Sequence, residues 1–262
     1  MQRKEDAMEI ANRTALITGG ASGLGAAVVR RIVKAGGNAV IFDIQQEKAT
    51  ALAAELGSSV LFCLTDVTRE DSVNDSIAKA REHFGGIHFC VNAAGTGWSE
   101  RTVSRTGPHS LPIFEQILRL NLVGTFNVAS KAAFAMSANE PNAKGERGVI
   151  VNVASIAAFD GQIGQAAYAA SKGAVVGMTL PMARDLSGLG IRVVTVAPGI
   201  FNTPLLAMLP EETIKALNNS VPFPRRIGEP DEFARLVEEI FLNAYINGEV
   251  IRLDGALRMA PK

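Results

Sequence analysis

The sequence alternates short apolar runs with longer amphipathic segments, and this alternation restricts the possible folds more than any other feature. The first half predicts strands at 15–18, 38–43, 60–64 and 87–92, separated by helices at 23–35, 45–56 and 69–84. Strands joined by helices of this length form βαβ units, in which the strands are parallel and the helices cover both faces of the sheet. We therefore predict a doubly wound α/β fold with right-handed crossovers.

The same rhythm continues to the end of the chain, with longer connections. The pattern predicts helices at 113–137, 165–186 and 231–242 and strands at 148–154, 191–197 and 249–253. Since neither an internal repeat nor a low-complexity linker interrupts it, we expect a frayed segment 1–10 followed by a single domain, 11–262. Within that domain, the stretch 200–224 is rich in Pro, Leu and Phe around a short helix near Pro210. It is too apolar for a plain solvent loop and is predicted to be a lid over an apolar substrate, the alternative being an oligomer contact.

Charge and apolar content exclude several classes of partner. The 262 residues carry 26 Lys and Arg against 26 Asp and Glu, so no basic surplus points to nucleic acid or to an anionic membrane. No stretch approaches the roughly 20 apolar residues that span a bilayer. The N-terminal MQRKEDAMEI lacks the apolar core of a secretory signal, and its acidic residues argue against a transit peptide. We expect a cytoplasmic protein, or a mitochondrial matrix protein in a eukaryote.

The two cysteines also indicate an intracellular protein. Cys63 and Cys90 both lie in apolar runs, which predicts buried thiols on adjacent strands in a reducing compartment. With two cysteines and no nearby histidine cluster, we expect no zinc or other metal site.

The first predicted strand runs directly into a glycine-rich turn, Thr18–Gly25, that opens the first helix. Glycines in this position allow a tight turn and a close approach of the backbone to a pyrophosphate, and the helix N-terminus offers free N–H groups to it. Turns collect glycine for other reasons, but the position between strand and helix favours a dinucleotide site. The predicted cofactor contacts in this turn are Gly19, Ser22, Gly23, Leu24 and Gly25.

Acidic and small residues follow the next strands. Asp43 ends the second strand, about twenty residues beyond the glycines, where a carboxylate can bind the ribose hydroxyls of NAD and repel the 2′-phosphate of NADP. An ordinary helix-cap role for Asp43 is compatible with this. Asp66 and Val67 close the third strand, where Asp66 either faces the adenine or caps a turn. The fourth strand ends in Asn92-Ala93-Ala94-Gly95, and we predict cofactor contacts at Asn92, Ala93 and Gly95.

Tyr168 and Lys172 are the candidate catalytic pair. They lie four residues apart in a predicted helix and therefore on one face of it. A phenol with a pKa of about 10 is a poor base at neutral pH, but a neighbouring cation favours the phenolate. We therefore expect Lys172 to lower the pKa of Tyr168. The pattern Tyr-x-x-x-Lys is short, and it gains weight here from the nucleotide site predicted upstream.

Two further polar residues are candidates for the same pocket. Ser155 ends a predicted strand thirteen positions before Tyr168, although a serine there is more often a cap. Asn121 interrupts the apolar face of a predicted helix, as either a core polar group or a functional ligand. The polar loop Thr96–Pro112 carries Arg101 and Arg105 at the mouth of the predicted sheet, where an arginine can meet a phosphate; its role stays open.

These features occur in one order along the chain: Thr18-Gly19-x-x-x-Gly23-x-Gly25, Asn92-Ala-Ala-Gly95, Asn121, Ser155, Tyr168-x-x-x-Lys172 and Pro198-Gly199. In this order the chain resembles the short-chain dehydrogenase/reductase family over nearly its whole length. Later stretches, including Gly161–Tyr168, Thr203–Leu206 and Asn247–Gly255, resemble the branch that acts on 3-hydroxyacyl-CoA thioesters and hydroxysteroids.

The resemblance implies a Rossmann-type sheet of seven parallel strands with helices on both faces, and a homotetramer. By motif match it implies that Asn121, Ser155, Tyr168 and Lys172 are catalytic, with Tyr168 and Lys172 also binding NAD and Asn121 holding a water that links Lys172 to solvent. Pro198, Gly199 and Ile200 would border the cofactor, and Thr203 would hold the nicotinamide carboxamide. Ser155, Tyr168, Gln165, Leu205 and Leu206 would face the substrate.

The predicted reaction is the reversible NAD-dependent oxidation of a secondary alcohol, with Tyr168 as base and Ser155 as hydrogen-bond donor to the substrate oxygen. The leading substrate is a 3-hydroxyacyl-CoA, and a hydroxysteroid or another secondary alcohol is the alternative. A carrier-protein oxoacyl reductase is disfavoured because such enzymes usually use NADPH. A non-catalytic NAD-binding scaffold with an RNA-processing role is disfavoured by the neutral charge and by the intact Ser, Tyr and Lys set.

Overall fold

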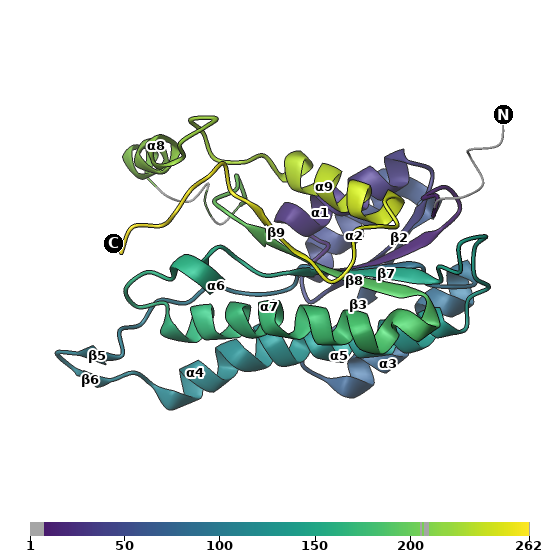
Figure 1. The fold of residues 1–262 in the computed structure, drawn as a ribbon, viewed down its shortest axis with the longest axis horizontal. Helices are drawn as coiled ribbons and strands as arrows, with labels where there is room; N and C mark the ends of the chain where they lie inside the picture. Colours follow the sequence, from purple (N-terminus) through teal and green to yellow (C-terminus); the bar gives the residue numbers. More distant parts are fainter. Residues whose placement is uncertain (1–7, 205, 207–209, 262) are drawn as a thin grey trace.

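A seven-stranded parallel sheet forms the centre of the computed structural model, which describes residues 8–204, 206 and 210–261 (Figure 1). The strands lie in the order β3-β2-β1-β4-β7-β8-β9, and every neighbouring pair is parallel. The strand order reverses between β1 and β4. The predicted Rossmann-type sheet of seven strands is confirmed. The strands of the sheet are β1 (Thr14–Thr18), β2 (Asn38–Asp43), β3 (Val60–Leu64), β4 (Phe89–Asn92), β7 (Gly148–Val153), β8 (Ile191–Pro198) and β9 (Val250–Leu253).

Helices cover both faces of this sheet (Figure 1). One face carries α1 (Gly23–Lys34), α2 (Gln46–Leu56) and α9 (Pro230–Leu242), and the other carries α3 (Glu70–Phe84), α5 (Gly124–Ser137) and α7 (Ala166–Leu186). The smaller helices are α4 (Leu111–Leu118), α6 (Ala157–Asp160) and α8 (Glu211–Ser220). Short 3₁₀ turns at Gly57–Ser59 and Ser187–Leu189 precede β3 and β8.

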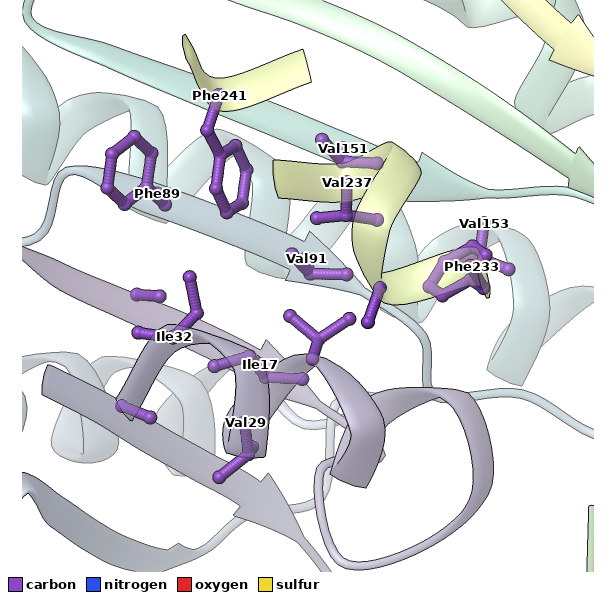
Figure 2. Packing of buried hydrophobic residues seen from close by; sticks show 14 of the residues in the cluster. Ile17, Val29, Ile32, Phe89, Val91, Val151, Val153, Phe233, Val237 and Phe241 are labelled. Carbon is purple, nitrogen blue, oxygen red and sulfur yellow. The ribbon is translucent and has the colours of Figure 1, made fainter. Parts of the chain in front are cut away.

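The core lies in two layers, one on each side of the sheet. On the α1 and α9 side, side chains of β1, β4 and β7 meet the apolar stripes of the two helices (Figure 2). Phe89 and Phe241 stack there with ring centroids 4.2 Å apart, an aromatic contact that adds to the gain from burying both rings. Because both faces are covered, the central strands β1, β4 and β8 are buried throughout, which explains their continuous apolar runs.

Two predicted segments between β4 and β7 have a different structure. The predicted helix 113–137 consists of α4 and α5 joined by a π-helical turn, Arg119–Val123. The preceding loop contains a small antiparallel hairpin, β5 (Val103–Ser104) with β6 (Gly107–Pro108). Pro112 belongs to the first turn of α4 and not to the loop, because a proline is tolerated where the helix needs no N–H donor.

Two expectations about the first hundred residues are wrong. Met8 and Ile10 are 4 % exposed and pack into the core beside α1, so the frayed segment does not extend to them; residues 1–7 lie outside the described part of the chain. Cys63 and Cys90 are buried thiols, as predicted, but their strands β3 and β4 are not adjacent, since β2 and β1 lie between them. No helix in the described part of the chain combines the length and the hydropathy needed to span a bilayer.

Candidate active site

A cavity of about 660 Å³ lies at the carboxyl ends of the strands, beside the point where the strand order reverses. Ligands of open α/β sheets bind at this position. Most of the predicted site residues line it: Gly19, Ser22, Gly23, Leu24, Gly25, Asp43, Asp66, Val67, Ala93, Gly95, Ser155, Tyr168, Lys172, Pro198, Gly199, Ile200, Thr203 and Leu206. The fold thus gathers motifs that are far apart in the sequence around one space.

The glycine-rich turn forms the cradle at one end of the cavity. Gly19 has a φ of +64°, and a Cβ on Gly25 would lie 2.2 Å from the carbonyl oxygen of Gly19. A side chain at Gly25 is therefore excluded, and α1 begins tightly against the end of β1. The Ser22 side chain makes no cap hydrogen bond to α1, which leaves N–H groups of the first helical turn available for an anion. This cradle suits the pyrophosphate of a dinucleotide.

Asp43 connects this turn to the end of β2. One carboxylate oxygen accepts a hydrogen bond from the Ala21 N–H at 3.0 Å, and the other accepts one from the Gln45 N–H at 2.9 Å. Asp43 is 6 % exposed and lines the cavity. Its carboxylate fixes the turn and places an acidic side chain in the cavity beside the cradle. Asp66 also lines the cavity, but one of its oxygens accepts hydrogen bonds from the backbone and hydroxyl of Thr68, which is the capping role left open above.

Ser155, Tyr168 and Lys172 meet at the other end of the cavity. Ser155 follows β7, while Tyr168 and Lys172 lie one turn apart on α7. Ser155 and Tyr168 both line the cavity there. The Lys172 ammonium lies 5.9 Å from the centre of the Tyr168 ring and donates to the Val153 carbonyl at 2.9 Å. The helical spacing therefore brings the pair together as predicted, with the serine as third member.

The electrostatics of this group differ from the prediction. Burial raises the pKa of Tyr168, and Ser155 opposes that shift only in part. Burial also lowers the pKa of the Lys172 amine to about 8. The expected lowering of the Tyr168 pKa by Lys172 is wrong for the protein by itself, because the low-dielectric surroundings disfavour both the phenolate and the ammonium.

Comparisons with known proteins agree with this geometry. The family model for short chain dehydrogenase matches residues 13–213. The 3-hydroxyacyl-CoA dehydrogenase type-2 of Drosophila melanogaster is 53% identical over 96% of this chain and 100% of its own length. The human protein of the same name is 51% identical over 94% of this chain and 95% of its own.

Solved structures give the same result. The crystal structure of 3-hydroxyacyl-CoA dehydrogenase type-2 from Mycobacterium avium superposes with a TM-score of 0.93 at 47% identity, covering 96% of this chain and 98% of its own. The 3-ketoacyl-(acyl-carrier-protein) reductase of Brucella melitensis, complexed with NADH, gives 0.85 at 29% identity, covering 96% of this chain and 100% of its own.

The chain belongs to the short-chain dehydrogenase/reductase family. It is therefore an oxidoreductase, and the resemblance inferred from its motifs is confirmed.

Asn121 supports this dehydrogenase site from the π-helical turn and is fully buried. Its side-chain amide donates to the Thr96 carbonyl at 2.9 Å and to the Ser171 hydroxyl at 3.0 Å, and its side-chain oxygen accepts from the Thr96 N–H at 2.9 Å. These bonds tie Thr96, in the segment that follows β4, to Ser171 of α7, the neighbour of Lys172. The structure thus gives Asn121 a positioning role, while the water it was expected to hold stays a prediction.

Besides Asn121, two of the described site residues predicted from the sequence, Asn92 and Gln165, do not line the main cavity. The Asn92 side chain is buried and donates to Asn152 at 2.9 Å inside the sheet, so a cofactor contact at Asn92 stays a prediction for its backbone. Gln165 lines a shallower neighbouring hollow together with Arg101, and its side-chain oxygen accepts from the Gln162 N–H. Leu205 lies outside the described residues.

Sequence reasoning missed other lining residues of the dehydrogenase cavity. The missed positions include Ile44, Thr65 and Ala94, each placed at or just beyond the carboxyl end of a strand, together with Leu120 and Phe201. The rule that ligands bind beyond the carboxyl ends of parallel strands could have found the first three. Leu120 offered no such signal, because it reaches the cavity only through the π-helical turn. No group of three or more potential metal ligands gathers in the described part of the chain.

The buried Lys172 generates a prediction about stability. Between about pH 8 and the ordinary lysine pKa of about 10.5, the unfolded chain binds more protons at this site than the folded chain, so stability rises with pH. At pH 7 the amine is charged in both states, and the folded protein carries the full cost of burying that charge. We expect Lys172→Met to stabilise the fold by about 2 kcal/mol at pH 7, after allowing for the lost hydrogen bond to Val153.

This gain should shrink toward zero as the pH rises from 8 to 10.5. Urea denaturation of both proteins at pH 7 and at pH 9.5 measures the difference. The same difference at both pH values would contradict the assignment of the penalty to the charged amine.

Proposed function

We propose that the protein catalyses the reversible NAD-dependent oxidation of a 3-hydroxyacyl-CoA to the corresponding 3-oxoacyl-CoA. The observation that carries this proposal is the meeting of Ser155, Tyr168 and Lys172 at one end of a cavity whose other end is the glycine cradle. Relatives about half identical over nearly the full length bear the name 3-hydroxyacyl-CoA dehydrogenase type-2. The name of these relatives suggests the substrate class, and the Ser155, Tyr168 and Lys172 group is suited to oxidising its hydroxyl.

NAD is the proposed cofactor, in preference to NADP. Among the described residues that line the cavity, the charged side chains are Asp43, Asp66 and Lys172, and Lys172 lies at the catalytic end. A 2′-phosphate near Asp43 would therefore meet a carboxylate and no compensating cation. When bound, oxidised nicotinamide accepts the hydride and brings a positive charge beside Tyr168.

The chain's own residues handle the proton and the substrate oxygen. In the oxidative direction Tyr168, as phenolate, removes the hydroxyl proton of the substrate, and Ser155 donates a hydrogen bond to the same oxygen as it becomes a carbonyl. Lys172 binds the nicotinamide ribose and adds positive charge near the phenolate. The Val153 carbonyl and Asn121 hold this part of α7 in place.

The apolar segment after β8 supports an apolar substrate at the mouth of the site. Ile200, Phe201, Thr203, Pro204 and Leu206 line the cavity beside Pro198-Gly199. The following helix α8 contains no buried residue, so the covering role proposed for 200–224 falls to the first part of that segment. An acyl chain is the proposed occupant, and the same surface favours a hydroxysteroid as second candidate.

We also propose that the protein assembles with further copies of itself into a homotetramer. Val123, Phe126 and Phe134 of the π-helical turn and α5 are 51%, 52% and 80% exposed, on the outer face of one helical layer. Large apolar side chains gathered on one helix mark an association surface. Sedimentation of the parent and of Phe134→Glu tests this assembly.

The substrate is tested by steady-state reduction with NADH. We expect kcat/KM for acetoacetyl-CoA to exceed that for a 17-keto steroid by at least about 100-fold, because each further tenfold requires only about 1.4 kcal/mol of selective binding. A higher kcat/KM for the steroid would replace the acyl-CoA proposal by the second candidate. If the protein reduces neither acetoacetyl-CoA nor the steroid, the proposed function is wrong.

The role of Tyr168 is tested by Tyr168→Phe. Loss of the phenol hydroxyl removes the proton acceptor, so turnover should fall by about 10³-fold or more. The ring remains in place, so NADH affinity, measured by fluorescence titration, should stay close to the parent value. Retained turnover would contradict the assignment of Tyr168 as the base.

Cofactor choice is tested by Asp43→Asn, which removes the charge while keeping an amide oxygen as acceptor. We expect the parent to bind NADH far more tightly than NADPH. The variant should lower the ratio of the NADPH Kd to the NADH Kd by about 10-fold or more, a change of about 1.4 kcal/mol. Asp66→Asn is the matched control, with one lining carboxylate removed elsewhere in the cavity. An unchanged NADH to NADPH ratio in Asp43→Asn would overturn the role of Asp43.

A further inference from the structure

An arginine on the last strand forms an ion pair with the short helix that follows the catalytic serine. The guanidinium of Arg252 on β9 donates to both carboxylate oxygens of Asp160 at the end of α6, at 3.2 and 2.5 Å. It also donates to Asp254 at 2.8 Å and to the Leu257 carbonyl at 3.0 Å, and it lies 5.2 Å from the centre of the Phe159 ring. Each guanidinium nitrogen thus has a partner, and the Arg252 and Asp160 side chains are only 20% and 17% exposed.

The same region fastens the C-terminal segment, residues 254–261, onto the loop between β7 and α7. The Gln162 side chain donates to the Ala260 carbonyl at 2.9 Å, and the Ile163 N–H donates to the Pro261 carbonyl at 3.0 Å. Leu257 packs against Ile156 in a small buried cluster. Because β9 is the edge strand of the central sheet, the Arg252 pair connects this loop to the sheet.

The loop held in this way begins with Ser155. The Ala157 N–H, at the start of α6, donates to the Ser155 hydroxyl oxygen at 3.1 Å, and the Ile156 N–H donates to the Pro198 carbonyl at 3.0 Å. α6 is only four residues long, Ala157–Asp160. A displacement of Asp160 at its far end is therefore passed directly to the backbone that aims the serine.

We propose that Arg252 and Asp160 are positioning residues, whose ion pair sets the Ser155 hydroxyl relative to the Tyr168 hydroxyl. This inference rests on the proposed function, in which these two hydroxyls act on the substrate oxygen. The planar fork of arginine is required because it bonds Asp160 in two places while also reaching Asp254 and Leu257. A lysine offers one point charge and cannot hold these groups together. The pair touches neither the cradle nor Asp43, so cofactor binding should be independent of it.

The test compares the full-length parent with Arg252→Met, Asp160→Asn and the rescue variant Asp160→Glu, which keeps the carboxylate. Arg258→Met is the matched control, because Arg258 also bonds Asp254 and the Leu257 carbonyl but has a side chain that is 61% exposed and no bond to Asp160. We expect Arg252→Met and Asp160→Asn to lower kcat for acetoacetyl-CoA by about 10- to 100-fold, a size typical of displaced reacting groups. In these two variants KM and NADH affinity should change less than about 3-fold. In the control, kcat should also change less than about 3-fold.

Amide hydrogen exchange of the 156–164 loop supplies a readout that needs no substrate. Exchange should accelerate at least about 10-fold in Arg252→Met and Asp160→Asn, and stay at the parent rate in Asp160→Glu and Arg258→Met. Faster exchange with unchanged kcat would overturn the positioning role, as would unchanged exchange. If the parent itself fails to reduce acetoacetyl-CoA, the proposed substrate is wrong, and the exchange rates still decide whether the pair holds the loop.

Discussion

The active site depends on one constraint, namely that the seven strands of the sheet are parallel. Parallel strands end at the same edge, so the residues just beyond β1, β2, β7 and β8 converge although more than a hundred positions separate the first from the last. The reversal of strand order between β1 and β4 keeps the helices from closing this edge. The cradle, the acidic residue Asp43 and the hydroxyl of Ser155 are each supplied by a different strand end, and none of them needs a long loop to reach the site.

That geometry also sets the electrostatics. The site places a phenol and an amine in surroundings that disfavour the charged form of each, which raises the pKa of Tyr168 and lowers that of Lys172. The protein by itself therefore holds Tyr168 as the neutral phenol. Activation as a base requires additional positive charge, and in the proposed reaction this charge comes with the oxidised cofactor. Proton removal is thereby coupled to cofactor binding, because in this proposal Tyr168 ionises to the phenolate only when the oxidised cofactor is bound.

The sequence predicted those parts of the molecule that depend on local periodicity and on strand ends. The alternation of strands and helices yielded the sheet, and the four-residue spacing placed Tyr168 and Lys172 on one face of α7. Asn92 shows the limit of this reasoning, because strand position alone does not reveal which way a side chain points, and this one points to Asn152 inside the sheet. The π-helical turn at Asn121 could also not be predicted from the sequence. Asn121 in this turn bonds Thr96 and Ser171, which are distant in sequence, and π-helical turns are frequent at functional sites. The shifts in the two pKa values depend on three-dimensional burial, which spacing does not record.

The division between rigid and variable parts of the site follows from where each group is mounted. Tyr168 and Lys172 lie on a 21-residue helix and Ser155 lies just beyond a buried strand, whereas in the proposed function loops form the substrate side. Those loops are nevertheless joined to the catalytic part. The Glu100 N–H donates to the Gly164 carbonyl at 2.8 Å, and a Cβ on Gly164 would lie 2.6 Å from the Ser99 hydroxyl oxygen. The loop that precedes the β5–β6 hairpin is thus seated against the backbone that connects Ser155 to Tyr168. A change at a contact point such as Gly164 should therefore affect both the loop before the hairpin and the backbone that connects Ser155 to Tyr168.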